Sequence, residues 1–153
     1  MMPLRHSRYG RYRFPADVIS YAVWLYFRFP LSLRMVAEML AARGILVSHE
    51  TVRQRALKFG QGFANQIRLR LPASGNKWHL DEVAMNNHQP TRRRERIMKR
   101  FRSAGHAQRF LSVHDQVASL FRRSAKSNAS DRRQSRARAF TVWAEVTNIA
   151  AGF

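Results

Sequence analysis

Helix start and stop signals divide residues 14–71 into three short segments, and this pattern constrains the fold more than any other feature. Pro30 ends the first segment, because the residue before a proline avoids the α-helical region. Gly44 follows the second segment, where helices commonly end with a left-handed residue. Ser32 and Ser48 precede the second and third segments and can cap their first turns. The sequence therefore predicts three helices in this region.

The second and third segments have the apolar spacing of amphipathic helices. In the second segment, apolar residues recur at i, i+3, i+4 and i+7, namely at Leu33, Val36, Ala37 and Leu40. In the third, Val52, Ala56 and Phe59 form an inward stripe. Two amphipathic helices joined by a short turn are the pattern of a helix-turn-helix.

The third predicted helix carries polar and basic residues at its start and on its outer face. These candidate DNA-binding residues are Ser48, His49, Thr51, Arg53, Gln54, Arg55 and Lys58. In a helix-turn-helix the N-terminal part of the second helix enters the major groove, where Arg can pair with guanine and Gln with adenine. We therefore predict a DNA-binding domain over residues 14–71. An ordinary solvated helix face is the alternative.

The net charge favours a polyanionic partner. The 153 residues include 28 Lys and Arg against 9 Asp and Glu, a formal charge of +19. Because contacts to phosphates supply most of the sequence-independent affinity for nucleic acid, DNA is the leading candidate. A protein that is simply basic, or one that binds an anionic membrane, is the alternative.

Two kinds of structure are excluded by composition. The chain has no cysteine, which rules out disulfides and thiolate metal sites. The apolar stretch at residues 18–27 is shorter than the roughly 20 residues that a membrane span needs. We expect a buried helix there, no membrane partner, and a cytoplasmic, nucleoid-associated protein.

Residues 76–121 combine one candidate strand with a basic segment. The alternating residues 77–83 present Asp81, a carboxylate suited to metal-dependent phosphoryl transfer. A basic run follows Pro90 and would lie along DNA phosphates if it forms a helix, with a solvated tail as the alternative. Its candidate DNA-binding residues are Arg92, Arg93, Arg94 and Arg96.

The last third of the chain contains two further predicted helices. Apolar residues recur at helical spacing over residues 106–121, and again from Phe140 to Val146. Residues 122–138 are almost without apolar side chains, so we predict a flexible basic linker there. The C-terminal helix is placed at residues 139–150. We expect these basic helices to be only loosely attached to the N-terminal helices.

Several of these motifs together resemble a known family. They are residues 31–44, 47–52, 78–82, 88–96 and 138–140, with Met98, Phe101 and Trp143. In these motifs the chain is similar to bacterial insertion-sequence transposases of the IS-six family. The resemblance implies an N-terminal helix-turn-helix followed by an RNase H-like domain that uses three acids, Asp, Asp and Glu, with Mg²⁺. It also implies that insertion-sequence ends are the DNA partner.

Carried over residue by residue, the resemblance leaves this triad incomplete. Asp81 matches the first acid, and Met85 stands where the glutamate is expected. The stretch that would carry the second acid is missing between Val83 and His88. A thioether cannot replace a carboxylate as a ligand for a hard cation. We therefore interpret the chain as an internally deleted transposase that has no bound metal or cofactor.

The expected fold is mainly α: a helix-turn-helix head, a one-stranded remnant of the RNase H-like domain at residues 76–121, and basic C-terminal helices. Three functions remain open. The first is a protein that holds transposon DNA without cutting it, alone, as a homo-oligomer or together with an intact transposase. The second is an active metal-dependent transposase, and the third is a translated remnant without a role.

Overall fold

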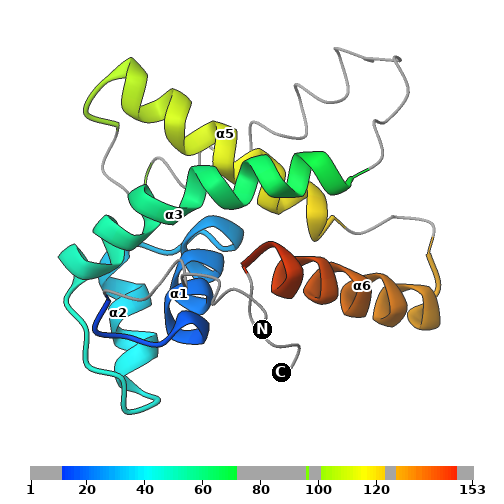
Figure 1. Ribbon diagram of the computed structural model, residues 1–153, viewed down its shortest axis with the longest axis horizontal. Coiled ribbons are helices and arrows are strands. Elements are labelled where there is room, and N and C mark those ends of the chain that lie inside the picture. Colours follow the sequence, from blue (N-terminus) through cyan, green and yellow to red (C-terminus); the bar gives the residue numbers. More distant parts are fainter. Residues whose placement is uncertain (1–11, 72–95, 97–100, 123–126, 148–153) are drawn as a thin grey trace, which may run out of the picture.

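The computed structural model describes residues 12–71, 96, 101–122 and 127–147. Within these ranges the chain forms five α-helices: α1 (Ala16–Arg28), α2 (Leu33–Ala41), α3 (His49–Arg70), α5 (Ala104–Leu120) and α6 (Ala129–Thr147) (Figure 1). No strand occurs in this part of the chain. The prediction of a mainly helical protein is confirmed. The predicted strand at residues 77–83 lies outside the described residues.

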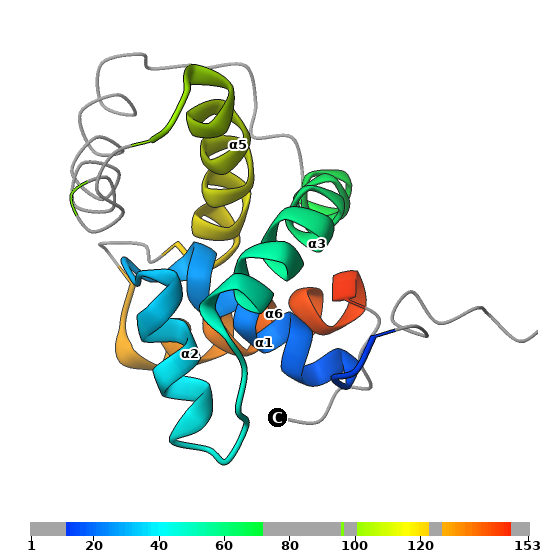
Figure 2. The ribbon, with the colours of Figure 1, turned by 90° about the vertical axis from the view of Figure 1, so that its left-hand side faces the viewer.

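Helix α3 occupies the middle of the molecule. Its 22 residues extend for about 33 Å at 1.5 Å per residue. Its first turns pack against α1 and α2, and α5 and α6 contact it further along (Figures 1 and 2). One uninterrupted helix therefore supports the N-terminal and the C-terminal helices alike.

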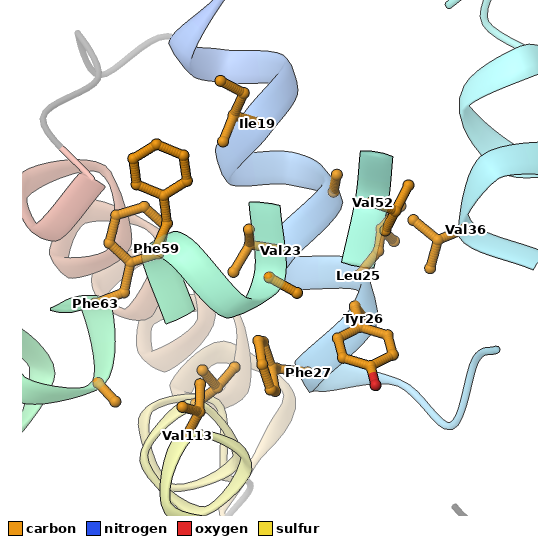
Figure 3. Close-up of a cluster of buried hydrophobic side chains, with 14 of the residues drawn as sticks. Ile19, Val23, Leu25, Tyr26, Phe27, Val36, Val52, Phe59, Phe63 and Val113 are labelled. Atoms are coloured by element: carbon orange, nitrogen blue, oxygen red, sulfur yellow. The ribbon is translucent and has the colours of Figure 1, made fainter. Parts of the chain in front are cut away.

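A single hydrophobic core joins all five helices. Near the start of α3, Val52 lies beside Val36 of α2 and Leu25 of α1 (Figure 3). Further along, α5 contributes Val113 to the same core, beside Phe27 of α1 (Figure 3). The expectation of loosely attached C-terminal helices was wrong, because the apolar faces of α5 and α6 are buried against the N-terminal helices.

Helix α6 corrects a second expectation. It begins at Ala129, inside the segment predicted as a flexible linker, and not near residue 139. The Asn128 side chain accepts a hydrogen bond from the backbone N–H of Asp131 at 2.8 Å, which caps the first turn. The following residues are mostly Ala, Arg and Gln, which favour helix without needing an apolar face. Residues 129–138 are therefore helical and exposed.

No helix in the described ranges is both long and apolar enough to cross a membrane.

Candidate nucleic-acid interface

The connection between α2 and α3 is fixed by backbone hydrogen bonds. The N–H of Gly44 donates to the carbonyl of Ala41 at 2.9 Å, and that of Ile45 donates to Leu40 at 3.0 Å. This is the pair of bonds of a Schellman motif, which needs a left-handed residue, and Gly44 has a φ of 79°. Ile45 is half-buried against the core. The turn therefore holds α3 at a defined position relative to α2.

Ser48 and Thr51 fix the first turn of α3. The Ser48 hydroxyl accepts a hydrogen bond from the backbone N–H of Thr51 at 3.1 Å. The two hydroxyl oxygens are also hydrogen-bonded to each other, 2.9 Å apart. The sequence predicts that both residues bind DNA, and in the free protein their hydroxyls are used to cap the helix.

Replacing Ser48 with alanine should therefore lower the free energy of unfolding by about 1 kcal/mol, because the cap of α3 is removed. Urea denaturation followed by circular dichroism measures this. Ser130, an exposed residue in the first turn of α6, provides the control, and its replacement with alanine should change stability by less than about 0.5 kcal/mol. Equal effects of the two substitutions would contradict the capping role.

One stripe of α3 is open to solvent. Its side chains recur at i, i+3, i+4, i+7 and i+8, the spacing of one helix face. We call this stripe the outer face of α3, and it consists of Glu50, Arg53, Gln54, Leu57 and Lys58. His49, at the start of the helix, is also exposed. The structure thus brings four of the predicted DNA-binding residues to the exposed side of the first three turns.

Glu50 and Arg53 form an ion pair on this outer face. Arg53 donates to both carboxylate oxygens of Glu50, with 2.9 Å between Nε and Oε2. These hydrogen bonds hold the pKa of the Glu50 carboxyl below its ordinary value. The pair is therefore present at neutral pH and is lost as the pH falls through that lowered pKa. Because both side chains are about half exposed, the pair contributes little stability, and Arg53 can exchange Glu50 for a phosphate.

Arg55 lies apart from the outer face. It is half-buried, and its guanidinium lies over the ring of Tyr12, 4.2 Å from the centroid. Its Nε is buried without a hydrogen-bond partner among the described residues. Helical spacing predicts that Arg55 binds DNA together with Arg53, but in the structure Arg55 stacks on the segment that precedes α1.

The other predicted site residues are mostly outside the described part of the chain. Asp81, Arg92, Arg93 and Arg94 lie in the range that the structure does not describe, and Arg96 is described and exposed. Sequence reasoning missed Leu57, a leucine that is 51% exposed on the outer face. Its position three residues after Gln54 and four after Arg53 was the sequence signal that places it on this face. An apolar side chain there is suited to the methyl group of thymine.

Comparison with known proteins gives a partial match. The chain is 35% identical over 76 residues to the transposase for insertion sequence element IS257 in transposon Tn4003 from Staphylococcus aureus. The same identity and length hold for the transposase for insertion sequence-like element IS431mec from S. aureus strains Mu50 and N315. The similarity is to transposases. It is distant and partial, and it agrees with the resemblance to the IS-six family.

The matched stretch makes up 49% of this chain and 34% of each of these relatives. The chain thus spans about a third of the length of the curated relatives it matches. No family model and no solved structure matches the chain.

Proposed function

We propose that this protein binds duplex DNA through α2 and α3, arranged as a helix-turn-helix, and holds insertion-sequence ends without cutting them. The outer face of α3 is the observation that carries this proposal. It presents Arg53, Gln54 and Lys58 on the first turns of a capped helix, and the turn after α2 fixes that helix in place. Arg and Gln can read base edges in the major groove, and Lys can neutralise phosphate.

The similarity to transposases supports DNA as the partner. Both groups of S. aureus relatives are named as transposases of insertion sequences. The formal charge of +19 supplies the sequence-independent attraction that such a partner requires. A homo-oligomer, or association with an intact transposase, would place this DNA-binding surface at both ends of an element.

The proposal that the chain does not cut DNA rests on its donor chemistry. By resemblance, Asp81 is the one matching acid, and Met85 takes the place of the glutamate. Two-metal catalysis needs several converging carboxylates, and a thioether is a poor ligand for Mg²⁺. This donor set does not fit the two Mg²⁺ ions, so no catalytic step is assigned to it.

Removing the basic side chains of the outer face should weaken duplex binding. In the double variant Arg53→Ala/Lys58→Ala, affinity for a labelled duplex that carries an insertion-sequence end should fall about tenfold or more. The slope of log affinity against log salt concentration should also decrease by about 0.9 for each phosphate that the variant no longer neutralises. Fluorescence anisotropy at several salt concentrations measures both quantities.

The matched control is Arg133→Ala/Arg138→Ala, which removes the same charge from exposed positions of α6. It should lower duplex affinity much less than the α3 double variant. Equal losses in the two variants would refute the assignment of α3 as the recognition helix.

Two further results, from cleavage and binding assays of the unmodified protein, would favour the alternative functions. Nicking of the duplex in Mg²⁺ or Mn²⁺, abolished by Asp81→Ala, would show an active transposase. Equal affinity for all duplex sequences, together with non-cooperative unfolding, would indicate a remnant without a role.

A further inference from the structure

An aromatic cavity lies where the C-terminal ends of α1 and α5 meet the N-terminal part of α6. We call it the α1–α5–α6 cavity, and its volume is about 320 Å³. Ligand sites in proteins measure about 300–1,000 Å³, so this one would hold a small ligand. Figure 2 shows the C-terminal end of α5 directed toward α1 and α6. The cavity shares no residue with the outer face of α3.

Three half-buried aromatic side chains form one wall of this cavity. The rings of Trp24 and Phe140 are 5.3 Å apart, and those of Phe121 and Phe140 are 5.0 Å apart. The indole Nε1 of Trp24 is buried without a hydrogen-bond partner among the described residues. The wall thus offers flat apolar surface to a ligand.

Basic side chains line the rest of the cavity: Arg28, Arg122, Arg132 and Arg136. Arg132 and Arg136 are one helical turn apart on α6 and precede Phe140 on the same face. Neither Arg122 nor Arg136 forms an ion pair with a described acidic residue. Arg132 donates from Nε to the backbone carbonyl of Ser127 at 2.9 Å, which holds its guanidinium in place.

Among the described residues, none that lines the cavity is acidic. Asp131, the acidic residue closest to Arg132 on α6, is exposed and is not part of the lining. The guanidinium groups of Arg122, Arg132 and Arg136 beside an aromatic wall, with no carboxylate among the described lining residues, favour a ligand that is both anionic and flat.

We propose that the α1–α5–α6 cavity binds one nucleotide of a single DNA strand. The base stacks on the aromatic wall, and its phosphate is held between Arg132 and Arg136. Aromatic platforms beside basic grooves are the usual means of binding single strands, and Arg suits phosphate through paired N–H donors. A base inside a duplex is stacked and paired, so it cannot enter such a cavity without leaving the helix. This site goes beyond the duplex-binding function and is tested separately from it.

Two double variants test the cavity at equal net charge. Arg132→Ala/Arg136→Ala removes two cavity arginines, and Arg133→Ala/Arg138→Ala removes two exposed arginines of the same helix that do not line it. The probe is a fluorescein-labelled oligothymidylate, and binding is followed by anisotropy. The cavity variant should bind this strand about tenfold more weakly, with a salt slope smaller by about 0.7 for each phosphate that it no longer neutralises. The control should stay within about twofold of the unmodified protein.

A third variant tests base stacking. Phe121→Leu keeps an apolar side chain but removes a flat ring, and it should weaken oligothymidylate binding about fivefold. Thermal unfolding of each variant shows that the fold is retained. Unchanged binding by Phe121→Leu would overturn the stacking assignment.

Competition experiments distinguish the sources of the ligand. If inorganic phosphate displaces the strand as effectively as thymidine 5′-monophosphate, the cavity is an anion site without base recognition. This outcome would overturn the proposal. The proposal is also overturned if thymidine 5′-monophosphate competes as strongly as unlabelled oligothymidylate, since the site would then take free nucleotides.

The same variants keep the two proposals apart. Arg53→Ala/Lys58→Ala should weaken duplex binding and leave single-strand binding unchanged, and the cavity variant should do the reverse. Equal loss of single-strand binding in the cavity variant and its α6 control would refute single-strand binding in the cavity. It would leave the duplex-binding proposal standing.

Discussion

Replacing Trp143 with alanine is expected to lower the free energy of unfolding by about 3–5 kcal/mol. Trp143 is 1% exposed, and its ring meets Phe63 of α3 edge-on at a centroid distance of 5.5 Å. Phe63 is completely buried, so solvent that entered the space left by the indole would expose the Phe63 ring. The substitution therefore removes the main apolar side chain by which α6 is attached to α3.

Urea denaturation followed by far-ultraviolet circular dichroism measures this effect. Thr141, an exposed residue two positions earlier on α6, is the control, and its replacement with alanine should cost less than about 0.5 kcal/mol. A loss below about 1 kcal/mol for Trp143→Ala would mean that α6 is not part of the common core, because buried Trp side chains cost more than this.

The second large effect is expected at Gly60, where α3 passes close to α1. A Cβ added at Gly60 would lie 2.9 Å from Cε2 of Phe27 and 3.4 Å from Cγ1 of Val113. The Phe27 ring is 4% exposed and is stacked on Phe110 at 5.5 Å, so it has little room to move. Overpacking of this kind costs about 1–3 kcal/mol. Gly60→Ala should therefore lose more by crowding than it gains in helix propensity.

Gly62 provides a matched control two residues further along α3. A Cβ there would meet nothing within 4 Å, so Gly62→Ala should stabilise the protein by about 0.5–1 kcal/mol through helix propensity alone. The propensity gain is common to both substitutions, and the difference between their unfolding free energies isolates the packing cost. We expect Gly60→Ala to be less stable than Gly62→Ala by about 1–3 kcal/mol. Equal stabilities would show that the Phe27 ring adjusts freely.

Local signals explain which parts of the fold were predictable. Ser32 accepts a hydrogen bond from the N–H of Met35, and Ser48 accepts one from Thr51, as their positions before apolar segments predicted. Gly44 has the left-handed φ that its place after α2 required. In each case the stabilising interaction lies within a few residues of the signal, so the sequence alone contains it.

The start of α6 was not predictable in the same way. Residues 129–138 have no apolar stripe, and the local signals there, the cap at Asn128 and the helix-favouring Ala and Arg residues, do not by themselves distinguish a helix from a basic linker. The helix is held from its far end by Trp143 and Val146, which are buried in a core formed with α1 and α3. That stabilisation comes from residues distant in the sequence.

The candidate site also combines features that local sequence predicts with features that depend on residues distant in the sequence. The outer face of α3 follows from helical spacing, and its exposed basic residues are where the pattern placed them. The stacking of Arg55 on Tyr12 joins distant parts of the chain, so spacing gave no sign of it. The α1–α5–α6 cavity is likewise assembled from three helices that are far apart in the sequence.

The continuity of α3 has a geometric consequence for DNA. One uninterrupted helix carries the outer face on its first turns and also contacts α5 and α6. A duplex bound at the first turns and a strand held in the cavity would therefore be separated by a span that the protein sets. A DNA end that occupies both sites would need a definite number of unpaired nucleotides to cover that span. Such a protein would select DNA ends by the length of their single-stranded overhang as well as by their sequence.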